Sequence, residues 1–467
     1  IHSKWGFFPS ASVAWRISDE PWMGWSRRAL DNAKIRLSAG SMGNGNVSPY
    51  SYTSEMTVST ADDIVLGGSY PSYTSVGSTV PVSLTWEKST TYDVGLDLDF
   101  FNNRLSVSGD YYRRYTTDMY TPSISLPSVY GTTSPKGNNA ELRTTGWELS
   151  LTWRDSFKLG GKPFDYSIKA MVWDNRTVVT KYENATRSLG TLKGYIQNGG
   201  SPSDFYEGME LGEMWGYTVA GLFRDQADID SSATHDFTQA SDKVTRPGQV
   251  KIADLDHNGN IDPGAFTADD HGDLSIIGNI NPHYMFGVNL AANWNGIGLS
   301  VFLQGVMKRD WYPSPDSGYF WGKYARPFMW VLGIHNYTDD MYSEEKNNWD
   351  TAYWPRMTTY QSNSSYSWTK LLEIPNTRYK QNAAYLRVKN IQVDYTFPKA
   401  LCQKIRLGGL KIYLSGENLF TFTPLHKYAP NFDPEALGYD TDFSSTAGDG
   451  YTYPVLKSVT LGVNITF

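Results

Sequence analysis

The sequence predicts an all-β protein: an antiparallel transmembrane β-barrel, contributing about eleven strands joined by long extracellular loops. Segments of about ten residues alternate between apolar and polar side chains, which is typical of strands with lipid on one side and water on the other. The last residues, 459–467, form such a strand and end on the aromatic Phe467. Chain ends of soluble domains are usually polar and frayed, so this closing strand favours a bacterial outer-membrane barrel.

The same alternation places the strands one by one. In the last strand the apolar positions are Val459, Leu461, Val463, Ile465 and Phe467. Asn295-Gly296, between two alternating runs, indicates a hairpin with a type I′ turn. The predicted strands are 6–17, 33–42, 90–101, 104–115, 143–154, 164–175, 284–295, 297–307, 384–397, 409–419 and 456–467.

The lengths of the links between strands predict the topology. Outer-membrane barrels have short periplasmic turns and long extracellular loops. Counting the β-like segment 213–223 as a barrel strand would invert this order over the N-terminal half, so we place it inside a long loop. The short links are then 18–32, 102–103, 155–163, 296 and 398–408. The long links, interpreted as extracellular loops, are 43–89, 116–142, 176–283, 308–383 and 420–455.

Eleven strands alone would leave two open sheet edges, and lipid cannot satisfy unpaired backbone groups. The sequence also opens at Ile1 without an initiator Met or a signal peptide, almost directly on a strand. We therefore expect the barrel to be completed by a further N-terminal part, either on the same chain or as a second chain.

Composition excludes several classes of protein. The 467 residues contain no apolar run of about 18 residues, which argues against membrane-spanning helices. The net charge of −7 argues against a nucleic-acid binder. The one cysteine, Cys402, excludes an intrachain disulfide and any CxxC pair, and we interpret it as an inert thiol in a short turn.

An ordered series of short segments resembles the SusC/RagA-type TonB-dependent transporters of Bacteroidota. The series runs through Gly6-Phe-Phe-Pro-Ser10, Trp15-Arg-Ile17, Ile35-Arg-Leu-Ser-Ala-Gly40, Gly43-Asn44, Trp86-Glu-Lys-Ser-Thr90, Asp93-Val-Gly-Leu96, Phe100-Phe-Asn-Asn-Arg-Leu105, Asp110-Tyr-Tyr112, Trp215-Gly-Tyr217, Gly221-Leu-Phe223, 254–262, Ile277-Gly278-Asn279, Tyr385-Leu-Arg-Val-Lys-Asn390, Gly416-Glu-Asn-Leu-Phe420, Phe432-Asp-Pro-Glu435 and Tyr453-Pro454. Each segment alone is a weak signal, but together, in this order, the segments span nearly the whole chain.

This resemblance implies the C-terminal half of a plugged barrel of about 22 strands in the bacterial outer membrane. It also implies a SusD-like surface lipoprotein as partner, energy coupling through TonB, and import of an oligosaccharide or a peptide. No segment of this sequence matches the plug domain or the TonB box, so residues for gating cannot be assigned.

One loop carries a metal-binding pattern. Residues 254–262 follow D-x-D-x-N-G-x-I-D, the first nine positions of an EF-hand-type calcium loop. The candidate ligands are Asp254, Asp256, Asn258, Asn260 and Asp262. Position 12 is Ala265 instead of an acid, and Asp273 is the displaced candidate for that ligand. The alternative interpretation is a turn whose side chains satisfy only their own backbone. No cofactor is required, and Ca²⁺ is the one metal that the pattern suggests.

The 308–383 loop is rich in aromatic residues that could contact the lid lipoprotein, contact a ligand, or pack on one another. The candidates are Trp311, Tyr312, Tyr319, Trp321, Tyr324 and Trp330. A second aromatic set, Tyr92, Trp147, Trp153 and Trp294, flanks the strands and is interpreted as the girdle at the membrane interface.

The sequence contains no HExxH, GxSxG or GxxxxGK[ST] motif, so we expect a transporter that does no chemistry on its substrate. The main alternative is a soluble secreted β-sandwich or propeller that binds or hydrolyses glycans. It predicts shorter strands and, for hydrolysis, two facing carboxylates about 5–9 Å apart. A second alternative is a signalling receptor built on the same barrel.

Overall fold

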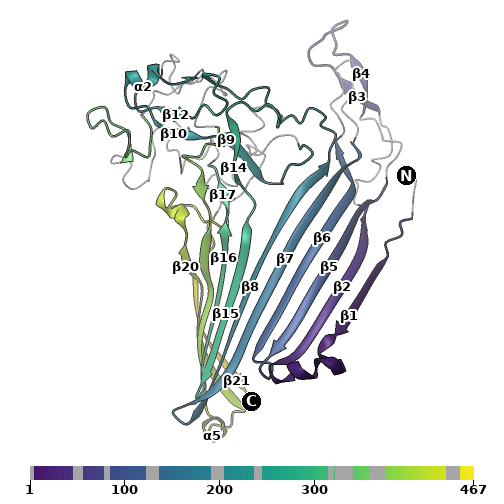
Figure 1. Cartoon of the computed structure of the whole chain (residues 1–467), viewed down its shortest axis with the longest axis vertical. Helices are drawn as coiled ribbons and strands as arrows, with labels where there is room; N and C mark the ends of the chain where they lie inside the picture. Colours follow the sequence, from purple (N-terminus) through teal and green to yellow (C-terminus); the bar gives the residue numbers. More distant parts are fainter. Residues whose placement is uncertain are drawn as a thin grey trace.

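The computed structural model describes residues 5–45, 56–77, 85–122, 136–190, 205–235, 245–313, 320, 340–356, 374–437 and 453–467. Its main feature is a single antiparallel sheet of eleven strands (Figure 1). The strand order is β1-β2-β5-β6-β7-β8-β15-β16-β19-β20-β21, so neighbours in the sheet are consecutive along the chain apart from strands inside the long loops. Among the described residues the sheet is open, with β1 and β21 at its two edges.

All eleven predicted strands are confirmed. Their bounds are β1 Ser10–Arg16, β2 Leu30–Asn44, β5 Glu87–Phe100, β6 Leu105–Pro122, β7 Lys136–Leu159, β8 Lys162–Lys181, β15 His283–Trp294, β16 Ile297–Lys308, β19 Tyr385–Thr396, β20 Gly409–Phe422 and β21 Ser458–Thr466. The Asn295-Gly296 turn is also confirmed, because Trp294 pairs with Ile297 and both turn residues have positive φ, 51° and 88°.

The predicted ends of β7 and β8 were wrong. Residues 155–163 were expected to be a link, but the two strands continue to a two-residue turn at Gly160-Gly161, where both φ values are positive. Asp155 interrupts the apolar positions of β7, but Phe157 and Leu159 resume the alternation, and Phe157 pairs with Phe164 across the ladder. One polar residue at an apolar position therefore does not mark the end of a strand.

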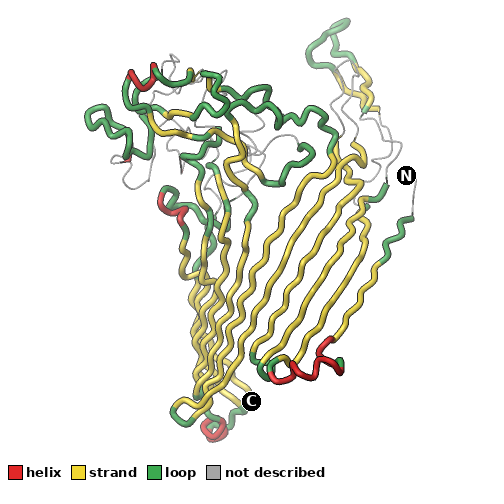
Figure 2. Tube along the Cα trace, viewed as in Figure 1, coloured by secondary structure: helices red, strands yellow, loops and turns green. Residues whose placement is uncertain are grey.

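Helical segments lie mainly at the end of the sheet that carries the short links (Figure 2). The 3₁₀ segments η1 Ile17–Asp19 and η2 Pro21–Arg28 join β1 to β2, and α5 Lys399–Lys404 joins β19 to β20. Cys402 in α5 is 1% exposed, as expected for a structural thiol. Within the described ranges, no helix has the length and apolar character needed to cross a membrane.

A loop assembly lies beyond the opposite end of the sheet (Figure 1). We define it as the described residues of 205–235, 245–282, 309–313, 320, 340–356, 374–384 and 423–437. It contains β9 Glu213–Tyr217, β10 Val219–Leu222, α2 Gln226–Asp230, β11 Thr234–His235, β12 Val250–Ile252, β13 Asn260–Ile261, β14 Leu274–Asn279, β17 Asp310–Trp311, β18 Gln381–Asn382 and η6 Pro424–Lys427. β9 pairs with β14 outside the main sheet, which confirms that 213–223 belongs to a long link. A separate hairpin, β3 Met56–Thr60 and β4 Ser72–Val76, extends from the same end of the sheet.

The main sheet exposes its apolar face. In β21, Val459, Leu461 and Val463 are 69, 73 and 54% exposed. The large cluster of buried apolar residues belongs instead almost entirely to the loop assembly. A soluble sandwich would bury such a face against a second sheet, whereas the described residues form one large sheet and several two-stranded ones. This arrangement fits a strand face covered by lipid.

The opposite face of the sheet is polar and carries its own side-chain network. Arg36 of β2 forms ion pairs of 2.9 Å with Asp97 of β5 and with Asp110 of β6. A Cβ atom on Gly95, between them, would lie 2.4 Å from an Asp110 oxygen and 2.5 Å from the Arg36 guanidinium carbon. Glycine at this position therefore allows the three charged side chains to meet across the strands.

Charge should be tolerated on one face of β21 and not on the other. We expect Leu461→Arg to lower the free energy of unfolding by about 2–4 kcal/mol, because it places a cation in the apolar band. Thr460→Arg, the matched control on the polar face, should cost less than about 1 kcal/mol. Urea unfolding of the full-length protein in lipid vesicles measures both, and equal losses would contradict the assignment of the faces.

Candidate functional site in the loop assembly

The long loops share one aromatic core, so the loop assembly is a single packed unit. Trp311 of β17 lies 4.9 Å from Phe432, measured between ring centroids, and therefore joins the 308–383 and 420–455 links. Tyr353 stacks on Tyr428 at 3.6 Å. Met214 from the 176–283 link is 0% exposed in the same cluster. Burial of aromatic area on this scale holds three otherwise separate links together.

Two of the six aromatic candidates belong to this core. Trp311 and Tyr312 are 1 and 3% exposed, and the hydroxyl of Tyr312 accepts a hydrogen bond of 2.8 Å from Nδ2 of Asn376. Little of either side chain is therefore left to contact a ligand directly. The other four candidates, Tyr319, Trp321, Tyr324 and Trp330, lie outside the described residues.

The acidic loop folds as a tight turn and brings three carboxylates together. Oxygens of Asp254, Asp256 and Asp273 lie within 4.8 Å of one another. The turn also uses these side chains itself. Oδ2 of Asp254 accepts the backbone N–H of residue 259, and Oδ1 of Asp256 accepts that of residue 258. The side-chain oxygen of Asn258 accepts the backbone N–H of residue 260, and Asp262 accepts that of residue 264. The Asn260 residue is exposed. Of the three aspartates among the sequence candidates, the structure therefore groups Asp254 and Asp256 with Asp273.

The electrostatics of this cluster fit a hard cation. Oδ1 of Asp254 is buried and accepts no hydrogen bond from any described residue. Asp273 is 0% exposed, and its two oxygens accept backbone N–H groups of Leu255 at 2.6 Å and Asp262 at 3.0 Å. Burial, followed by the negative charges of Asp256 and Asp254, raises the pKa of Asp273. Carboxylate oxygens are the ligands that Ca²⁺ prefers, and the ion would relieve this repulsion.

A buried ionic network fastens the 420–455 link to the sheet, and sequence reasoning did not find it. Arg387 of β19 is 3% exposed and forms ion pairs of 2.5 Å with Asp433 and 2.7 Å with Glu435. Tyr385 and Lys389 also bind Glu435. Burial alone would raise the pKa of Asp433, but hydrogen bonds from Arg387 and from backbone N–H groups outweigh it and lower that pKa. Both segments were noted in the sequence, yet nothing in it shows that residues 46 positions apart meet.

Another buried carboxylate, that of Glu213, has no cation partner among the described residues. Glu213 of β9 is 5% exposed; it accepts hydrogen bonds from the Tyr206 hydroxyl and, at 2.9 Å, from Nε1 of Trp215. Burial raises the pKa of Glu213 more strongly than these hydrogen bonds lower it. Glu210 adds a like charge nearby, and the Arg187 guanidinium lies over the Tyr206 ring at 5.2 Å.

The sheet and its loop assembly together define a segment of an outer-membrane β-barrel. A family model described as TonB dependent receptor-like, beta-barrel, matches residues 1–252. Because that match covers more than half of the chain, the protein belongs to this family, whose members are outer-membrane proteins.

Named relatives agree with this assignment. TonB-dependent receptor P3 of Formosa agariphila is 27% identical over 477 residues, covering 100% of this chain and 42% of the relative. TonB-dependent receptor SusC of Bacteroides thetaiotaomicron is 24% identical and covers 100% of this chain and 40% of the relative. The chain therefore spans less than half the length of the curated relatives it matches.

Solved structures show the same fold. A structure of the RagAB peptide transporter superposes with a TM-score of 0.64 at 20% identity, covering 98% of this chain and 43% of that chain. The RagAB peptide importer in its 'open-open' state gives a TM-score of 0.66, also at 20% identity, covering 98% of this chain and 42% of that chain.

The buried Glu213 should make the loop assembly sensitive to pH. Since its pKa is raised on folding, its stabilising contribution is complete below the pKa of an unfolded Glu, about 4.3, and is lost as pH rises through the folded value. The unfolding temperature of the wild type should therefore fall between pH 4 and pH 7. Because Gln carries no charge, this fall should be smaller for Glu213→Gln. Tryptophan fluorescence of the full-length protein measures this, with exposed Glu207→Gln as the control. Parallel pH profiles for wild type and Glu213→Gln would refute the assignment.

Proposed function

We propose that the protein imports a nutrient across the outer membrane as part of a TonB-dependent transporter. The observation that carries this proposal is the sheet with one exposed apolar face and one polar face, from a family of TonB-dependent receptors. A polar face such as that of Arg36, Asp97 and Asp110 suits the lining of a water-filled lumen. The substrate would be bound and released without chemical change.

We infer further that the substrate is an oligosaccharide or a peptide, delivered with a SusD-like surface lipoprotein. The RagAB structures are described as peptide transporters or importers, and SusC is a curated relative. The loop assembly supports a docked partner, because Arg387 and the shared aromatic core hold its links in one packed unit at the end of the barrel. A preordered surface reduces the entropy lost on association.

The import proposal predicts a growth defect and a co-purified partner. Deleting the gene should abolish growth on either an oligosaccharide mixture or a peptide mixture as the sole nutrient, and leave growth on monosaccharides or amino acids unchanged. A restored full-length copy should recover growth only in cells with intact TonB. Mass spectrometry of the detergent-purified protein should find a lipoprotein in near-equal amount. Normal growth of the deletion strain on both mixtures, with no lipoprotein bound, would refute the proposal.

We also propose that Asp254, Asp256 and Asp273 bind a structural Ca²⁺. The support is the calcium-loop pattern together with the buried, unsatisfied oxygen of Asp254. The ion would hold the turn between β12 and β14. It would take no part in transport chemistry.

Calcium should stabilise the loop assembly, and the effect should depend on Asp273. At a Ca²⁺ concentration 30-fold above the dissociation constant, the gain in the free energy of unfolding should be about 2 kcal/mol. Thermal unfolding in Ca²⁺ and in EGTA measures it. Asp273→Asn should abolish the gain, whereas Asp270→Asn, the matched control outside the cluster, should retain it. Equal unfolding curves for the wild type in Ca²⁺ and EGTA would mean that the turn needs no ion.

A further inference from the structure

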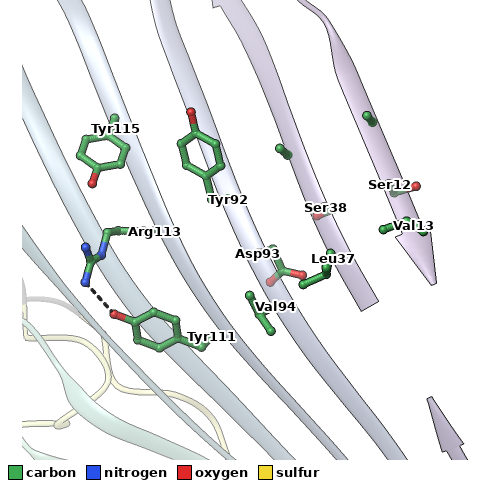
Figure 3. A pocket seen from close by; sticks show the side chains of 12 residues that line it. Ser12, Val13, Leu37, Ser38, Tyr92, Asp93, Val94, Tyr111, Arg113 and Tyr115 are labelled. Carbon is green, nitrogen blue, oxygen red and sulfur yellow. Dashed lines mark hydrogen bonds between the residues drawn. The ribbon is translucent and has the colours of Figure 1, made fainter. Parts of the chain in front are cut away.

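An open groove crosses the apolar face of the sheet where β1, β2, β5 and β6 lie side by side (Figure 3). Its volume is about 660 Å³. Small and aliphatic side chains form its floor, among them Ala11, Val13, Leu37, Ala39 and Val94. Their register is continuous, since Ala11 pairs with Ala39 and Leu37 pairs with Val94. The alanines leave a depression between the bulkier neighbours on the lipid-facing side.

The groove lies at one edge of the apolar band. On β5 the band runs from Phe100, beside the short turn, to Tyr92. Eight residues of a strand tilted by about 40° rise roughly 20 Å, close to the height of the apolar band of outer-membrane barrels. Tyr92 therefore lies at the interface on the side of the long links. The ring of Tyr115 lies beside it, with 6.3 Å between the ring centroids, and Tyr111 pairs with Val94, further into the band.

A cation follows directly where the apolar band ends. Arg113 pairs in register with Tyr92, on the same face, and its Nη2 donates a hydrogen bond of 3.2 Å to the Tyr111 hydroxyl. Arg143 pairs with Tyr115, and Lys88 pairs with Thr117, so both share this face. None of these three cations forms an ion pair with a carboxylate in the described part of the chain. A set of uncompensated cations above a lipid-facing groove is complementary to an anionic lipid.

We propose that this site binds a phosphorylated glycolipid of the outer leaflet, of the lipid A type. The guanidinium of Arg113 holds the phosphate, the hydroxyls of Tyr111 and Tyr115 donate to it, and an acyl chain fills the groove over Ala11 and Ala39. Guanidinium suits this role because it binds phosphate oxygens with two parallel donors. Arg143 and Lys88 add positive charge for a second anionic group. The site is separate from the proposed transport path, which lies on the other face of the sheet.

The chain supplies a matched control for Arg113 in the next residue. Arg114 points to the polar face, where its Nε donates to the Thr91 hydroxyl at 3.3 Å and its guanidinium lies 5.9 Å from the Tyr112 ring centroid. Arg113→Gln and Arg114→Gln therefore make the same change in charge and volume at adjacent positions on opposite faces.

Native mass spectrometry of the full-length protein in detergent, with added diphosphoryl lipid A, tests the proposal. Arg113→Gln should reduce lipid occupancy about tenfold, because a hydrogen-bonded charge contact is lost. Arg114→Gln should bind like the wild type, and Arg113→Lys should retain most of the binding. Dephosphorylated lipid A should bind the wild type about as weakly as the phosphorylated lipid binds Arg113→Gln.

Three results would overturn the proposal. The first is equal occupancy for Arg113→Gln and the wild type. The second is equal binding of the dephosphorylated lipid, which would leave only acyl-chain contact. The third is competition by inorganic phosphate at low millimolar concentration, which would indicate a site for free anions. Heat-modifiable mobility on gels should be the same for all variants. If Arg113→Gln does not fold, the comparison of phosphorylated with dephosphorylated lipid A on the wild type still tests the proposal.

Discussion

The fold depends on one constraint: backbone N–H and C=O groups surrounded by lipid must find partners within the protein. The eleven-stranded ladder meets this constraint strand by strand, from β1 to β21. Side chains then need only alternate, with apolar groups such as Leu461 toward hydrocarbon and polar groups such as Thr460 toward water. A main sheet of this kind needs no buried core on its outer face.

The packed core lies instead in the loop assembly. Three long links contribute to one cluster of buried aromatic and aliphatic residues, and Arg387 with Asp433 and Glu435 fastens that cluster to the sheet. Apolar side chains face lipid in the sheet but pack on one another in the loop assembly. Apolar residues are therefore exposed in the first and buried in the second. Val463 is about half exposed in its strand, whereas Trp311 is almost fully buried in the assembly.

Local patterns predicted most of the sheet, because the period of two is set by neighbours in sequence. The Asn295-Gly296 turn and the exclusion of 213–223 from the sheet followed from turn chemistry and link lengths. The end of β7 was not predicted, because the polar Asp155 interrupts the apolar positions although Phe157 and Leu159 continue the strand. The grouping of Asp273 with Asp254, and of Arg387 with Asp433, depends on how the long links fold back. That folding is set by tertiary packing, which no short window of sequence contains.

The two faces of each strand should meet different solvents, lipid on one side and water on the other. Nitroxide labels placed singly along β21, at positions 459–466 of the full-length protein in lipid vesicles, test it most directly. Accessibility to oxygen should peak at Val459, Leu461 and Val463, and accessibility to a water-soluble nickel complex should peak at the residues between them. A profile without a period of two, or one in which the nickel complex reaches both faces equally, would show that neither face of β21 is covered by lipid.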